Sequence, residues 1–237
     1  MNHTGNAALA DDQTLSVLEG TDLADGVAVR QVAETLRGAD DGELFVEKRQ
    51  SESLVFDDGK LKAASFDESQ GFGLRAVCGE TAAYAHGTEL SLSALRRAAE
   101  VCATVTRGRS ATLALSPERT NRALYASANP ALALSFAEKV ALLQKADAFA
   151  RSLDPRVQQV SVSLAADWQS VEIIRGDGQI YRDIRPLVRF NISVVSSNGK
   201  DQGAGSHGFG GRGAPLSYLT GEAWQEAARE ALRQSLV

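Results

Sequence analysis

A glycine-rich segment near the end of the chain has the clearest potential for chemistry. Residues 203–208 and 208–213 both match the pattern G-x-G-x-x-G. In dinucleotide-binding proteins that pattern needs a strand just before the glycines, a helix directly after them and a later parallel strand. Here a polar stretch comes before the glycines, Ala214-Pro215 separates them from the next predicted helix, and no strand follows. The sequence therefore favours a mobile loop, where glycine lets the backbone lie close to something else.

Ser206 and His207 are adjacent in this segment and suggest a nucleophile with its base. The surrounding residues, Ala204-Gly205-Ser206-His207-Gly208, lack the first glycine of G-x-S-x-G. That motif also belongs to a parallel α/β sheet. We therefore favour a solvent-facing segment, and an enzyme that uses Ser206 and His207 is retained only as a third hypothesis.

Metal ligands are scarce and widely spaced. The histidines and cysteines are His3, His86, His207, Cys78 and Cys102, with no H-E-x-x-H or C-x-x-C spacing among them. This spacing predicts no metal-binding or catalytic residue in the chain. Free cysteines on a strand and a helix are typical of small buried apolar side chains.

A group of arginines lies on neighbouring predicted strands. They can grip a carboxylate or the acidic edge of a partner. The alternative, which we favour, is salt bridging to nearby acidic residues. The arginines are Arg175, Arg182, Arg185 and Arg189, and the acids are Glu172, Asp177 and Asp183.

The composition is that of a globular, acidic protein. The 237 residues are 43% hydrophobic and 23% charged, with a net charge of −5, which excludes a disordered chain and argues against a nucleic-acid partner. No run approaches the ~18 apolar residues of a membrane span, and the N-terminus lacks the apolar core of a signal peptide. Two cysteines in a chain of this length indicate a reducing compartment, so we predict a cytoplasmic protein.

Hydrophobic periodicity predicts helices and short antiparallel strands in two groups. Helices are expected at 23–37, 91–105, 130–153 and 220–236. Strands are expected over 43–88, broken by turns at 57–59, 69–71 and 79–80, and over 156–196, with turns at 176–178 and 198–199.

This order predicts an α+β fold with two antiparallel-sheet/helix layers, each with flanking helices. We expect a loose leader over 1–22, an N-terminal α+β domain over 23–106, a linker over 107–129 and a second α+β domain over 130–237.

Several stretches together resemble the TldD family of the TldD/PmbA metalloproteases. They follow the family order over most of residues 40–237. They are residues 51–100, with a Gln-Gly-x-Gly-x-Arg turn and strand at 70–75; residues 139–174; residues 183–195, followed by Gly210-Gly211-Arg212; and the final helix at 226–237.

The resemblance implies a subunit of a cytosolic, zinc-dependent peptidase that pairs with a PmbA (TldE)-type subunit or with itself. Such subunits enclose a chamber for unfolded or short peptides. The family's zinc comes from a helical H-E-x-x-x-H motif in a C-terminal domain, and no histidine of this sequence matches it. We therefore expect the N-terminal portion of such an enzyme, without bound zinc and inactive by itself.

Two functional hypotheses follow. The first is a portion of a TldD-type metallopeptidase that serves assembly and chamber lining. The second is a non-catalytic module that binds a peptide or a PmbA-type subunit. For either one, we expect Gly208, Gly210, Gly211 and Arg212 to lie near the substrate or partner.

Overall fold

A computed structural model of the chain describes residues 16–24, 26–115 and 124–237. It is an α+β fold built on one six-stranded sheet in the order β3-β2-β1-β4-β5-β6, with every neighbouring pair antiparallel. The α+β class and the antiparallel pairing are confirmed. The strands of the two halves join a single sheet, because β1 pairs with β4 from Glu43 opposite Arg175 to Asp57 opposite Ser161.

Five of the six strands in the described residues have 10 or more residues, and the longest helix, α3, has 18. The strands are β1 (Asp41–Asp57), β2 (Lys60–Cys78), β3 (Thr81–Gly87), β4 (Val157–Arg175), β5 (Ile180–Ser197) and β6 (Gln202–Gly211). The helices are α1 (Val27–Thr35), α2 (Leu92–Thr106), the 3-10 helix η1 (Pro130–Leu132), α3 (Phe136–Leu153), α4 (Pro215–Tyr218) and α5 (Gly221–Ser235).

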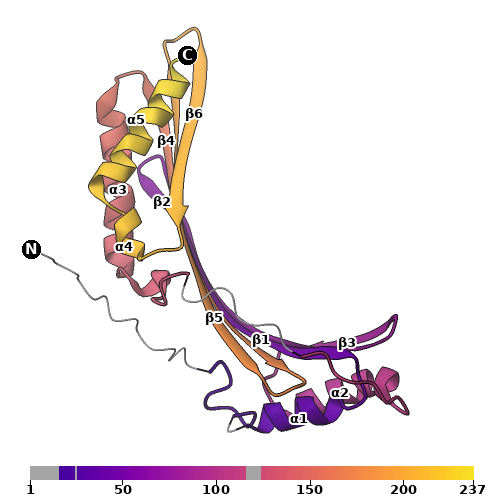
Figure 1. Cartoon of the computed structure of the whole chain (residues 1–237). Coiled ribbons are helices and arrows are strands. Elements are labelled where there is room, and N and C mark those ends of the chain that lie inside the picture. Colours follow the sequence, from indigo (N-terminus) through magenta and orange to yellow (C-terminus); the bar gives the residue numbers. More distant parts are fainter. Residues whose placement is uncertain (1–15, 25, 116–123) are drawn as a thin grey trace, which may run out of the picture.

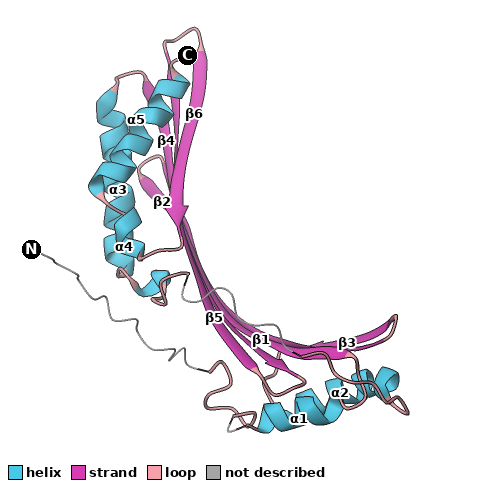
Figure 2. Cartoon of the chain, viewed as in Figure 1, coloured by secondary structure: helices cyan, strands magenta, loops and turns pink. Residues whose placement is uncertain are grey.

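The sheet bends midway, and helices cover one of its faces at each end (Figure 1). At one end α1 and α2 enclose a first core, which includes Leu44, Leu74 and Leu95. At the other end α3 and α5 enclose a second core, which includes Leu143 and Phe190. Both helix pairs lie on the outer side of the bend, so the sheet's other face lines the inner side without a helix over it (Figure 2).

Turn chemistry determines where β1 ends. Asp58 and Gly59 both have positive φ, at 49° and 75°, as a type I′ hairpin turn requires. The turn predicted at 69–71 is wrong, because β2 continues through it with Gln70 opposite Lys48 and Gly71 opposite Glu47. Here Gly71 relieves crowding, since a Cβ on it would lie 2.9 Å from the Gly87 carbonyl oxygen.

The strand β5 continues through Pro186 without a break. Proline has no N–H for a sheet ladder and is tolerated where one side of its strand is unpaired. Because β6 begins to pair with β5 only at Val188, β4 is the one strand of the described residues that pairs with Pro186, with Trp168 opposite it.

The helix expected over 130–153 is interrupted near its start. Ser135 caps α3 by accepting a hydrogen bond from the Glu138 N–H, while the Glu138 side chain accepts one from the Ser135 N–H. This capping box fixes a new helix start after η1. The other three helices lie where the sequence predicts them, with α1 shorter at both ends.

The expected leader and linker are partly described. Residues 1–15 and 116–123 lie outside the described residues. Residues 16–24 form turns in which Val17, Leu18 and Leu23 are buried in the first core. The proposed division at 107–129 stays a prediction.

Candidate functional site

The glycine-rich segment is a strand, which corrects the prediction of a mobile loop. Residues 202–211 form β6 and pair with β5 from Ser197 opposite Gln202 to Val188 opposite Gly211. The prediction of a loop failed because glycine is depleted in strands and the segment has no period-two apolar pattern that would indicate a strand. What the glycines provide is close packing on one side of the strand, a need visible only in three dimensions.

The helix α5 lies directly on β6. A Cβ on Gly203 would overlap the carbonyl oxygen of Ser235, and one on Gly205 would overlap that of Ala231. Any other residue at these positions would push the helix away from the sheet. The glycines at 203 and 205 are therefore explained by packing within the chain.

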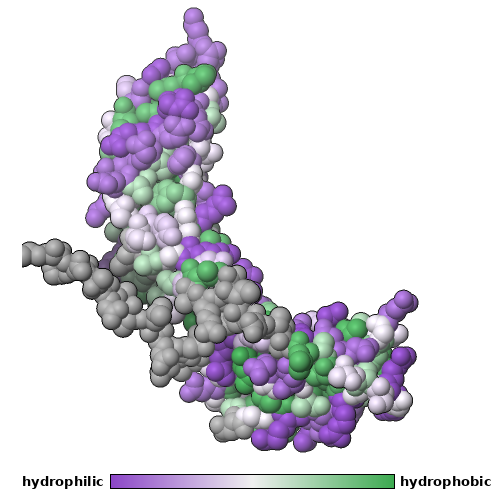
Figure 3. Space-filling view, viewed as in Figure 1, coloured by the Kyte–Doolittle hydropathy of each residue, from purple (hydrophilic) through white to green (hydrophobic). Residues whose placement is uncertain are grey.

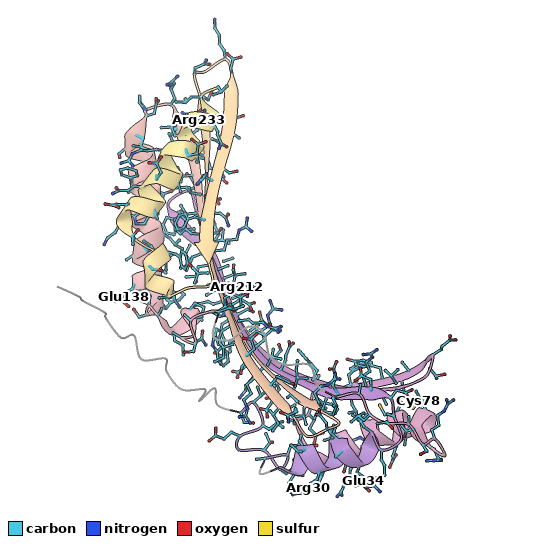
Figure 4. All side chains as sticks on the ribbon, viewed as in Figure 1. Arg30, Glu34, Cys78, Glu138, Arg212 and Arg233 are labelled. Atoms are coloured by element: carbon cyan, nitrogen blue, oxygen red, sulfur yellow. The ribbon has the colours of Figure 1, made fainter. Side chains whose placement is uncertain are left out.

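The nominated residues Gly208, Gly210, Gly211 and Arg212 form the end of β6 and the residue after it. They reach the bend of the molecule, where Arg212 is labelled in Figure 4. The Tyr218 ring covers Gly211, because a Cβ there would lie 2.5 Å from the ring. The structure thus brings the four together along one strand end.

Arg212 ties three segments together at the bend. Its Nη1 donates to the Pro186 carbonyl at 3.4 Å, and its guanidinium lies 5.3 Å from the centre of the Tyr125 ring. Its own carbonyl accepts a hydrogen bond from the Ala126 N–H at 3.3 Å. An arginine with these contacts positions β5, β6 and the segment 124–126, and its side chain is exposed.

The inner face of the sheet carries a polar network near the same bend. Side chains alternate along a strand, and Glu52 of β1 reaches Lys139 of α3, so Arg49 lies on the opposite, inner face. Its guanidinium donates to Asp167, with Nε 2.8 Å from the carboxylate, and this hydrogen bond raises the pKa of Arg49. Nearby, Gln169 donates to Glu47.

The favoured salt bridges are present for Arg182 and Arg185, whereas Arg175 pairs with acids of β1 that the prediction did not include. Arg175 bridges Asp41 and Glu43, Arg182 bridges Glu172, and Arg185 bridges Asp183. Arg189 differs, since its Nε donates to the amide oxygen of Asn191 at 3.3 Å. This leaves Arg189 as an exposed guanidinium on the inner face.

Ser206 and His207 do not form a nucleophile and base pair. Because they are consecutive in β6, their side chains point to opposite faces of the sheet. His207 lines a shallow cavity of about 310 Å³ on the helix side, with Phe209, Tyr218 and Glu226. The third hypothesis therefore lacks its required geometry.

The described residues do not fit a zinc site. His86 stacks on Tyr84 at 5.8 Å on β3, whereas His207 lies on β6, and both cysteines are buried and free. Burial raises the pKa of the Cys102 thiol, which disfavours the thiolate that a metal needs. Across residues 16–24, 26–115 and 124–237, no three His, Cys, Asp or Glu side chains converge as metal ligands.

Sequence reasoning identified Glu172 only as a salt-bridge acid and missed its burial. Glu172 of β4 is 2% exposed; its Oε2 accepts from the Ser16 Oγ at 2.6 Å and the Val17 N–H at 2.9 Å, and its Oε1 from Arg182 at 3.1 Å. It holds residues 16–18 against the first core, beside a cavity of about 370 Å³. Glu172 lies opposite Val46 on the helix-covered face, and this register is known only from the structure.

Two models of one metallopeptidase family match the chain. Residues 42–115 match the PmbA/TldA metallopeptidase domain 1, and residues 129–237 match the central domain of the same family. The chain belongs to the TldD/PmbA metallopeptidase family. Among the described residues, no helix is both long and apolar enough to cross a membrane.

Relatives and solved structures agree with this membership. A metalloprotease TldD homolog of Haemophilus influenzae is 38% identical over 85% of this chain, and one of Buchnera aphidicola subsp. Acyrthosiphon pisum is 33% identical over 77%. The structure of TldE from Thermococcus kodakarensis shares the fold, with a TM-score of 0.67 at 14% identity, over 87% of this chain and 46% of that one. The chain spans 43% and 37% of the two curated relatives' lengths.

Proposed function

We propose that this chain is the N-terminal portion of a TldD-type zinc metallopeptidase and that it serves assembly and the lining of a peptide chamber. The observation that carries the proposal is the 38% identity to a metalloprotease TldD homolog over 85% of this chain. The proposed setting is the cytoplasm, with a PmbA (TldE)-type subunit or a second copy as partner and unfolded or short peptides as substrate.

The shape of the sheet supports a lining role. Its helices all lie outside the bend, so the inner face presents strand side chains directly (Figure 2). That face combines the Arg49–Asp167 pair with the exposed Arg189, which together suit polar contacts to peptide groups. The space-filling view also shows hydrophilic side chains spread over both ends of the molecule (Figure 3).

Among the residues that the structure describes, no three His, Cys, Asp or Glu side chains converge to hold the zinc of such an enzyme. No catalytic step is therefore assigned to any side chain of this chain. The proposed contribution is structural: Gly208, Gly210, Gly211 and Arg212 hold the bend and face the substrate or partner.

The alternative is a non-catalytic module that binds a peptide or a PmbA-type subunit. Unpaired edges of the sheet favour it, because an extended peptide can add as a further strand through main-chain hydrogen bonds. The two proposals differ in whether this chain works as part of a catalytic assembly.

The test compares three purified samples for zinc content and peptide hydrolysis. They are the chain alone, the chain with a PmbA-type subunit, and the chain with that subunit and the remaining portion of a TldD homolog. We expect no zinc and no peptide hydrolysis from the chain alone, and chelator-sensitive hydrolysis from the full set. A complex that forms and stays inactive in the full set supports the binding module. Chelator-sensitive hydrolysis by the chain alone contradicts both proposals.

A further inference from the structure

The first part of β2, residues 60–70, is an edge strand with no neighbour on one side. β3 pairs with β2 only over Phe72–Cys78, and the rest of β2 pairs only with β1 within the described residues. All side chains from 60 to 70 are exposed, including Phe66 at 56%. An unpaired strand of this length presents a row of free N–H and C=O groups.

This edge lacks most of the features that block strand addition. Proteins usually protect such edges with proline, with bulges along the strand, or with a covering helix or loop. Residues 60–70 contain no proline or glycine, and the one irregularity in the ladder, between Val55 and Phe56, lies at the end near the turn. Among the described residues, α3 packs on β4 and β1 and α2 packs on β2, but every residue from 60 to 70 is exposed.

The charges of the segment are arranged to match a second copy. Lys60 and Lys62 lie at its start, Asp67 and Glu68 lie toward its end, and so it carries no net charge. Two copies that run antiparallel about Ser65 place Lys62 opposite Glu68 twice, and Ala64 opposite Phe66 twice. Opposite charges across an antiparallel pair are favourable, whereas like charges in those positions are destabilising.

We propose that residues 60–70 of β2 pair with the same residues of a second copy, so that two sheets continue as one across a two-fold axis at Ser65. Such an isologous contact is closed, because each edge satisfies the other. Lysines on a sheet edge discourage pairing with an unrelated strand, but in this register Lys62 lies opposite Glu68 of the second copy, and Lys60 lies opposite the neutral Gln70. This inference rests on the proposed function, in which a second copy is one of the two partners, and deepens it by naming the surface through which that copy would bind.

Charge reversal tests the proposed register. The variants Lys62→Glu and Glu68→Lys each place like charges opposite one another at two symmetric positions, and the double variant restores opposite charges. We expect each single variant to weaken the dimer about tenfold or more, and the double variant to return to near the wild-type affinity. Lys200→Glu, in the exposed turn between β5 and β6, is the control for the charge change and should leave the dimer unchanged.

Sedimentation equilibrium of the 237-residue chain supplies the readout, from about 1 μM to about 1 mM, a range that covers weak contacts. Amide hydrogen exchange should show protection of residues 62–68 that grows with concentration. A chain that stays monomeric, single variants without effect, or a double variant as weak as the singles would each overturn the proposal. Binding of the same variants to a PmbA-type subunit, measured separately, distinguishes this failure from failure of the proposed function.

Discussion

At the residue scale, the glycines of β6 show how one signal can have two causes. A run of glycines is compatible with a loop near a ligand and with a strand that a helix approaches closely. Gly203 and Gly205 belong to the second case, because α5 lies over them. If close packing requires these glycines, replacing one of them should lower the free energy of unfolding.

Gly205→Ala should destabilise the protein by about 1–3 kcal/mol, since the new methyl group overlaps the Ala231 carbonyl and the helix must shift. Chemical unfolding monitored by circular dichroism gives the free energy of unfolding. Gly221→Ala is the matched control, because that position is open and helical, and it should be neutral or stabilising by up to about 1 kcal/mol. Equal effects at the two positions would contradict the packing explanation.

At the scale of elements, the capping box of α3 decides where the helix starts and so where η1 and the bend are held. Glu138 lies at the end of α3 near the bend (Figure 4). Hydrogen bonds from the Ser135 hydroxyl and N–H lower the pKa of Glu138. The helix start is also fixed by Lys139, which bonds both Glu52 of β1 and the Ala131 carbonyl of η1.

Ser135→Ala should lower the free energy of unfolding by about 1 kcal/mol, as loss of an N-cap does. It should also raise the pKa of Glu138 toward its ordinary value, which NMR titration measures. Because the folded pKa is depressed, the contribution of Glu138 is present above its unfolded pKa and is lost as pH falls through the folded pKa. Ser152→Ala, at the exposed far end of the same helix, leaves the cap intact, and a similar shift in that variant would argue against this account.

At the scale of the whole molecule, β1 and β4 run through both cores. Leu44 of β1 belongs to the first core, and Leu54 of the same strand belongs to the second. The two halves therefore share hydrogen bonds along two unbroken strands rather than meeting at a surface. This continuity predicts cooperative unfolding, even though each half has its own helices.

Leu143→Ala should cost about 2–5 kcal/mol and lower the unfolding midpoint of both halves together, because Leu143 is fully buried in the second core. Amide signals of Leu44 and Leu54 report the two halves in a denaturant series followed by NMR. The exposed Leu115→Ala is the control and should stay within about 0.5 kcal/mol of wild type. Separate midpoints for Leu44 and Leu54 would instead favour the two-domain division at 107–129.

The sequence by itself determined what depends on neighbouring residues. Local patterns located α2, the Asp58-Gly59 turn and the antiparallel character of the strands, since helical periodicity, turns and tight hairpins act over a few residues. Motifs spread along the chain were enough to indicate the family.

Only the tertiary structure decided which strands meet and why certain residues are needed. The pairing of β1 with β4 joins residues more than one hundred positions apart, and the close approach of α5 explains the glycines of β6. Glu172 likewise accepts hydrogen bonds from Ser16 and Val17, which are distant from it in the sequence. Such contacts depend on which surfaces are brought together in space, and no local periodicity records that.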